Sequence, residues 1–79
     1  MARVLLFGPL RDLAGWRERE LSAASLADLR RTLSAEDPAL AEALAAPGVQ
    51  VALDQAIVRG DAALSPGAEV AFLPPMSGG

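Results

Sequence analysis

The side chains that most often carry out chemistry in proteins are missing from this chain. It has no Cys and no His, and all seven of its basic residues are Arg, so it also has no Lys. Without these side chains there is no thiolate, no histidine-activated nucleophile, no usual zinc or iron ligand set and no Schiff-base amine. A solvated surface explains the ten acidic residues more simply than a catalytic carboxylate pair does. The sequence therefore predicts no metal site and argues against an independent enzyme.

The group best suited to chemistry is the backbone carboxylate at Gly79. The last eight residues run from Phe72 and Leu73 through Pro74 and Pro75 to Met76, Ser77, Gly78 and Gly79. Glycine has no Cβ, so a carboxylate on Gly79 is unhindered and can enter a slot too narrow for another residue. An end of this shape suits an activating enzyme.

The same segment has the dimensions needed to reach a partner. Residues 74–79 span roughly 20 Å when extended, and two prolines with fixed φ stiffen their base. The alternative is that the di-glycine is an idle frayed end and that the prolines only terminate a strand.

Hydrophobic periodicity predicts the elements that would hold this tail. Short apolar or alternating runs predict strands, and spaced leucines behind capping residues predict two helices. The expected strands are 3–7, 16–21, 49–53, 56–58 and 69–73, the helices begin at 25–26 and 37–38, and residues 10–14 form one helical turn. The first and last strands should be central neighbours, with 16–21 at an edge. We expect one α+β domain over residues 1–79, with 73–79 as an extended tail.

Local signals support these boundaries. Ser25 and Asp28 have the spacing of a capping box, and Asp37 followed by Pro38 is a second helix start. Residues 54–55 are expected to form a hairpin turn, and residues 65–68 place Pro and Gly for a type II turn.

Charge and hydropathy bear on partners and location. The net charge is −3, which argues against nucleic acid as a ligand and favours a partner with a basic docking surface. No apolar run approaches the ~18 residues that span a bilayer, and the N-terminal run is too short for a signal peptide. Together with the absence of Cys, this leads us to expect a soluble, cytoplasmic protein with no membrane partner.

A docking patch is predicted near the tail. Phe72 and Leu73 face opposite ways in a strand, so Phe72 can join the core while Leu73 is offered to a partner, with Ile57 beside it. The alternative is that both Leu73 and Ile57 belong to the core.

Several segments in the right order resemble a known family. These are residues 10–15 (LRDLAG), 51–55 (VALDQ) and 69–79 (EVAFLPPMSGG), behind a first strand ending at Phe7. They resemble the MoaD/ThiS family of ubiquitin-like sulfur carriers, and most of all the small subunits of molybdopterin synthase. The resemblance covers essentially the whole chain. It implies a β-grasp fold, with a mixed sheet of about five strands, helices packed on one face and a flexible Gly-Gly tail.

The resemblance also implies a function. Gly79, supported by Gly78, would be adenylated by an E1-like, MoeB-like adenylyltransferase that uses ATP, and a sulfur donor would then convert it to a thiocarboxylate. The sulfur would pass to the pterin precursor of molybdenum cofactor on a MoaE-like large subunit of molybdopterin synthase. The chain itself would bind no cofactor. Partner-binding residues would be Phe7, Arg11, Ile57, Leu73, Pro74, Pro75, Met76 and Ser77.

Three points stay open in the sequence. The carrier could serve thiamine, cysteine or tRNA thiolation instead, or the chain could be a non-catalytic β-grasp interaction module. Arg11 could bind a partner carboxylate or, as we slightly favour, pair locally with Asp12. Asp54 stands where the family often has Asn, which keeps the turn chemistry but changes the charge.

Overall fold

The computed structural model describes residues 1–75, and within them it shows an α+β fold built on one five-stranded sheet. The elements in chain order are β1 (Ala2–Leu6), α1 (Pro9–Ala14), β2 (Glu18–Leu21), α2 (Leu26–Glu36), α3 (Pro38–Leu44), β3 (Gln50–Leu53), β4 (Ala56–Val58) and β5 (Glu69–Leu73). All predicted strands and helices are present, and their boundaries differ from the predicted ones by at most two residues.

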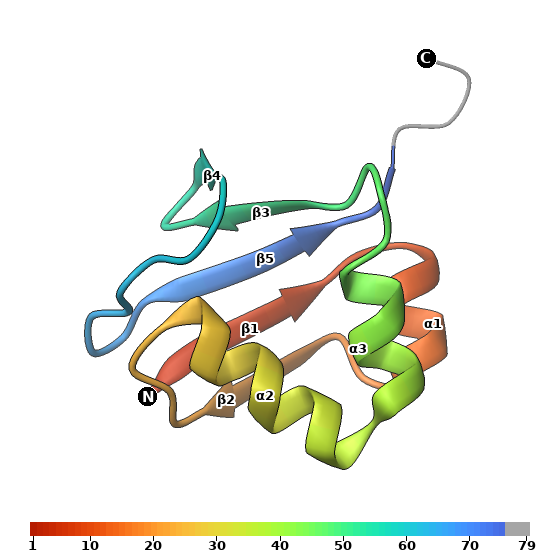
Figure 1. Ribbon diagram of the computed structural model, residues 1–79, viewed down its shortest axis with the longest axis horizontal. Coiled ribbons are helices and arrows are strands. Elements are labelled where there is room, and N and C mark those ends of the chain that lie inside the picture. The colour runs from red at the N-terminus through yellow and green to blue at the C-terminus, as the bar shows by residue number, and fades with distance from the viewer. Residues whose placement is uncertain (76–79) are drawn as a thin grey trace.

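The sheet is mixed and has the strand order β2-β1-β5-β3-β4 (Figure 1). β1 and β5 are parallel neighbours in the middle, whereas the other pairs are antiparallel. This confirms that the first and last apolar runs are central and that the polar strand β2 lies at an edge. A central β5 is paired on both sides, so the chain that follows it starts from a well-held strand.

The three helices lie on one face of the sheet (Figure 1). The leucines spaced at i, i+3 and i+7 on α2 are buried against this face, as predicted. They share one core with buried residues of α3 and the central strands, namely Leu26, Leu29, Leu33, Leu40, Leu44, Val4, Leu6, Val51, Val70 and Phe72. Each fully buried large side chain contributes about 2 kcal/mol of hydrophobic stabilisation.

Both predicted helix starts are capped. The Asp28 amide donates to Ser25 Oγ at 3.1 Å, and the Leu40 amide donates to Asp37 Oδ1 at 3.1 Å. The Asp28 carboxylate reaches back as expected, but it accepts from the amide of Ala24 rather than from that of Ser25. This hydrogen bond, together with one from Arg31, lowers the pKa of Asp28.

The β3–β4 hairpin holds the start of β5. Asp54 and Gln55 have φ of 49° and 72°, the left-handed values that suit a two-residue hairpin turn. The Asp54 amide donates to the Glu69 carbonyl at 2.9 Å, and the Glu69 amide donates to Asp54 Oδ1 at 3.0 Å. The predicted turn at 65–68 closes with the Ala68 amide on the Ser65 carbonyl at 3.0 Å. β5 is therefore anchored at its beginning, which helps to place its end.

No helix among residues 1–75 is long and apolar enough to cross a membrane.

Candidate docking surface

The sheet face without helices is the open face. Side chains alternate along a strand, so the neighbours of buried Val4, Val70 and Phe72 project onto this side. The register sets Leu5 beside Ala71, Ala71 beside Ala52, and Ala52 beside Ile57, which makes one apolar row across four strands. Leu73 lies on the same face, opposite Gln50 of β3. We call Leu5, Phe7, Ala52, Ile57, Ala71 and Leu73 the apolar patch.

The patch offers large side chains to solvent. Ile57 is 50% exposed and Phe7 is 45% exposed, while Leu73 is half-buried and Phe72 is completely buried. The predicted division between a core Phe72 and an outward Leu73 is confirmed, and the alternative that Ile57 belongs to the core is wrong. Exposed apolar side chains gathered on one face are typical of a binding surface.

One detail of the predicted patch is wrong. Ile57 shares the open face with Leu73 but does not lie beside it, because β3 separates their strands and Ile57 lies in the row of Ala71. The two strands are about 10 Å apart at the usual spacing. The patch is therefore broad, with two alanines in its middle.

Phe7 and Arg11 lie at the edge where β5 ends. Leu6 is paired with Phe72, so Phe7 and Leu73 leave the two central strands at the same edge. Arg11, Arg17 and Glu18 line a shallow hollow there together with Leu5, Leu6 and Phe7.

The favoured local pair between Arg11 and Asp12 is not formed. Within residues 1–75, the ion pairs involve neither Arg11 nor Arg17. Adjacent residues of a helix project in different directions, which explains why Asp12 does not reach its neighbour. Arg11 is exposed and available to a carboxylate on a partner.

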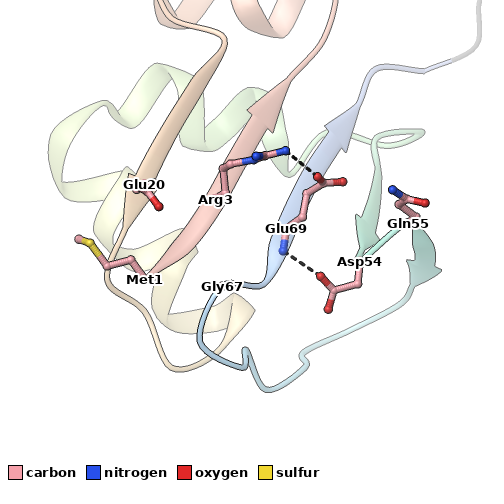
Figure 2. A pocket seen from close by; sticks show the side chains of 7 residues that line it. All are labelled: Met1, Arg3, Glu20, Asp54, Gln55, Gly67 and Glu69. Carbon is pink, nitrogen blue, oxygen red and sulfur yellow. Dashed lines mark hydrogen bonds and ion pairs between the residues drawn. The ribbon is translucent and has the colours of Figure 1, made fainter.

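The opposite edge of the open face is polar. Arg3 Nη2 lies 3.0 Å from Glu69 Oε1, and Arg3 Nε lies 3.6 Å from Glu18 Oε2. Arg3, Glu20, Asp54 and Glu69 line a hollow there together with Met1, Gln55 and Gly67. Figure 2 shows Glu69 joined to Arg3 on one side and to Asp54 on the other, while Glu20 lies apart from them. Sequence reasoning missed this cluster, although opposite charges on paired strands are a detectable signal once the register is known. Arg3, Asp54 and Glu69 already have partners within the sheet, so they offer less to a docking protein than unpaired groups would.

The base of the tail lies between two loops. Pro74 is half-buried and Pro75 is exposed. A methyl group on Gly8, in the β1–α1 loop, would lie 3.4 Å from Pro74 Cγ. A methyl group on Gly48, in the α3–β3 loop, would lie 3.0 Å from Pro75 Cβ. The sequence alone does not indicate these contacts, because Gly8 and Gly48 are far from residues 74–75 in the chain and meet them only in the tertiary fold.

The described residues hold no obvious catalytic constellation. Within residues 1–75 there is no group of three or more His, Cys, Asp or Glu side chains that could hold a metal ion. In the same range every buried polar side-chain atom has a hydrogen-bond partner. The predicted reactive and tail residues Met76, Ser77, Gly78 and Gly79 lie outside the described residues.

Comparisons with known proteins agree with the fold and the resemblance. The model of the ThiS family matches residues 4–79. The chain is 36% identical to the molybdopterin synthase sulfur carrier subunit of Escherichia coli (strain K12), over the whole of both chains.

Two solved structures share the fold. The crystal structure of SAMP1 from Haloferax volcanii has a TM-score of 0.82 and 25% identity, covering 99% of this chain and 98% of that one. The solution structure of small archaeal modifier protein 1 from Methanosarcina acetivorans has a TM-score of 0.86 and 26% identity, covering 99% and 95%. With the five-stranded mixed sheet and its one-sided helices, these matches establish that the chain is a ubiquitin-like β-grasp protein and belongs to the ThiS family.

Proposed function

We propose that this chain is a sulfur carrier that serves as the small subunit of molybdopterin synthase. In this role the Gly79 carboxylate becomes a thiocarboxylate whose sulfur goes to the pterin precursor of molybdenum cofactor. The full-length similarity to the sulfur carrier subunit of E. coli supports the proposal, and so does the family match, which extends to residue 79.

The observation that carries the proposal is the place where β5 ends. This central strand finishes at the edge that also carries Phe7 and Arg11, and Pro74 and Pro75 follow it directly. A partner docked on the apolar patch would therefore sit next to the start of the tail. A docking surface beside a slim carboxylate-bearing segment is what delivery of that carboxylate requires.

The chemistry makes the chain a substrate rather than a catalyst. A Gly79 carboxylate oxygen attacks the α-phosphorus of ATP on an E1-like adenylyltransferase, and pyrophosphate leaves. A sulfide equivalent from the sulfur donor then attacks the acyl carbon. The bond between this carbon and the phosphate oxygen breaks, and AMP leaves. Activation is needed because a carboxylate is otherwise an inert electrophile. A chain without Cys can carry sulfur only on its backbone terminus.

Each partner has a defined role. The large synthase subunit binds the apolar patch and holds the pterin precursor, while the adenylyltransferase supplies the ATP site, so the carrier binds no cofactor of its own. We place this exchange in the cytoplasm, where a chain without disulfides needs no oxidising compartment.

The test is reconstitution with purified components. The carrier is incubated with ATP, a MoeB-like adenylyltransferase and a sulfur donor, and intact mass spectrometry should show one oxygen replaced by sulfur. Adding the large subunit and the pterin precursor should return the carrier to its original mass and produce the dithiolene. A variant lacking Gly79 is the control, because it should dock normally but transfer no sulfur.

The two stages separate the possibilities. If a known carrier is converted under the same conditions and this chain is not, the sulfur-carrier function is excluded, and an interaction module or a protein modifier remains. If the thiocarboxylate forms but the pterin precursor is not converted, the sulfur belongs to thiamine, cysteine or tRNA thiolation.

The likeness to SAMP1 favours a second candidate, a protein modifier. In that role an amine of another protein would attack the carbonyl of the Gly79 acyl-adenylate, and AMP would leave as the amide forms. The chain has no Lys, so its own surface cannot be extended into lysine-linked chains. Formation of an amide with an added lysine-containing acceptor, rather than sulfur transfer to the pterin precursor, would identify this function.

A further inference from the structure

We propose that Gly48, assisted by Gly8, is a positioning residue that sets the direction in which the tail leaves the sheet. The two glycines let the backbones of two loops approach Pro74 and Pro75 from either side. This inference rests on the proposed function, because the direction of the tail matters only if residue 79 must be delivered to a partner.

The α3–β3 loop provides the closer contact. The Val49 amide donates to the Ala46 carbonyl at 3.2 Å, which closes a tight turn with Pro47 and Gly48 at its centre. Gly48 has a φ of +88°, and a methyl group there would lie 3.0 Å from Pro75 Cβ and 3.2 Å from Pro75 Cγ. Real Cβ atoms essentially never approach other atoms more closely than the first of these distances. Any side chain at position 48 would therefore press on Pro75.

The β1–α1 loop provides the second contact. Gly8 caps α1 with φ 56° and ψ −134°, a combination that is almost restricted to glycine, and it lies against the Pro74 ring. Because β5 lies between β1 and β3, the loop after β1 and the loop before β3 flank the end of β5 on opposite sides. Figure 1 shows the α3–β3 loop passing close to the end of β5.

The prolines make this contact effective. Their rings fix φ at two consecutive positions, so the course of the chain there depends mainly on ψ and on what the rings touch. The backbones of the two loops contact these rings, and they therefore restrict the direction of the chain at Pro74 and Pro75. A reacting group misplaced by about 1 Å costs roughly 100-fold in rate, so a restricted course favours transfer.

The chain offers a matched control for a test at Gly48. Gly60 has a similar φ of +74°, but a methyl group there would meet nothing within 4 Å. Gly48→Ala and Gly60→Ala therefore impose a similar backbone strain, and only the first presses on the tail base. The measurement is the steady-state formation of thiocarboxylate, with the carrier as the varied substrate of the adenylyltransferase.

We expect Gly48→Ala to lower kcat at least about tenfold with KM within twofold of wild type, since the added methyl group changes the direction of the tail and leaves the exposed side chains of the domain in place. Gly60→Ala should leave both constants within twofold. Equal effects of the two variants would overturn the proposal. Failure of the wild-type chain to form the thiocarboxylate would instead overturn the proposed function.

A double variant tests the contact itself. Pro75→Gly removes the ring and the Cβ that the new methyl group would meet. In a Pro75→Gly background, the additional loss from Gly48→Ala should therefore shrink to that of Gly60→Ala. An undiminished loss in this background would show that Gly48 acts through the stability of its own loop and would contradict the proposal.

A measurement independent of activity uses the absence of Cys. With Ser34→Cys on α2 and Ser77→Cys as the only two cysteines, spin labels report the distance between the helix layer and the tail by pulsed electron resonance. We expect Gly48→Ala to shift or broaden this distance distribution and Gly60→Ala to leave it unchanged. Identical distributions in all three proteins would overturn the proposal even if the activities differ.

Discussion

At the beginning of β5, the polar groups of the open face are paired with one another. At the end of β5, the open face presents exposed apolar side chains. At the beginning, Arg3 is shared between Glu69 and Glu18, and Asp54 accepts from the Glu69 amide. At the end, Phe7 is 45% exposed, Leu73 is half-buried and Arg11 has no ion pair within residues 1–75. We call these regions the polar end and the tail end.

One sheet therefore carries two kinds of exposed group: charges at the polar end that pair with one another, and side chains at the tail end that are available to a partner. Exposed ion pairs contribute little stability each, but they leave few groups for a partner to satisfy. Exposed apolar side chains beside an unpaired arginine can gain energy when a partner covers them. The net charge of −3 suggests a partner with a basic surface. The hollow at the tail end, however, is lined by Arg11 and Arg17, which have no ion pair within residues 1–75, and by Glu18, which pairs with Arg3. We therefore expect the partner to offer a carboxylate to Arg11 at this end.

Among the variants that test this comparison, Leu73→Asp should have the largest effect, which is a loss of affinity for the large synthase subunit. A carboxylate in the apolar patch would have to be desolvated on docking, and we expect affinity for the large synthase subunit to fall about 100-fold or more. Isothermal titration calorimetry with the purified subunit measures this. Glu69→Ala, on the same strand and face but at the polar end, should bind like wild type. A folded Leu73→Asp variant with unchanged affinity would refute the docking surface.

Charge reversal at each end sharpens the comparison further. Arg11→Glu should slow association with the large subunit about tenfold at low salt, because an attractive pair becomes repulsive. Glu20→Arg makes a change of equal size at the polar end and should alter the rate less than about twofold. Stopped-flow measurements across a salt series test both, and the Arg11 effect should shrink as salt screens it. Equal effects at the two ends would show that only the net charge matters.

The hairpin bond at the polar end should affect stability and leave binding intact. Asp54→Ala removes the acceptor for the Glu69 amide and places Ala at φ 49°, so we expect about 1–2 kcal/mol lower free energy of unfolding. Asp54→Asn, which suits the same turn, should lose less than about 0.5 kcal/mol. Urea denaturation gives both values. A marked loss of large-subunit affinity in either folded variant would show that the partner docks at the polar end, and it would contradict docking at the tail end.

The smallest effect is expected at Arg3. Its side chain is 49% exposed, so Arg3→Met should cost less than about 1 kcal/mol and should not alter affinity for the large subunit. Thermal unfolding at low and high salt measures the change, and the difference from wild type should narrow at high salt. A difference that persists at high salt would mean that packing of the Arg3 stem, rather than the ion pairs, is responsible.

Much of the fold could be read from local patterns. The capping residues Ser25 and Asp37, the turn at 65–68 and the alternation of 49–53 each specify their element over a few residues. The central place of the first and last strands follows from their apolar composition, because a strand covered on one face and flanked on both sides needs such residues. The outward direction of Leu73 follows from alternation alone.

The remaining features join residues that are distant in the chain. Gly48 meets Pro75, and Arg3 meets Glu69, across 27 and 66 positions of sequence. Ile57 was expected beside Leu73, but strand order placed β3 between them. Arg11 and Asp12 were expected to pair because they are adjacent in the chain, but adjacent side chains of a helix do not face each other.

The sequence by itself excluded chemistry by the side chains of Cys, His and Lys, which the chain lacks, and it therefore predicts the backbone carboxylate as the best candidate group. It also determined the elements, since caps, turns and periodicity act over short range. Only the tertiary structure decided which edge of the open face is apolar and unpaired and which loops enclose the tail base. Those features depend on strand order and register, which are set by burial of the whole core rather than by any local segment.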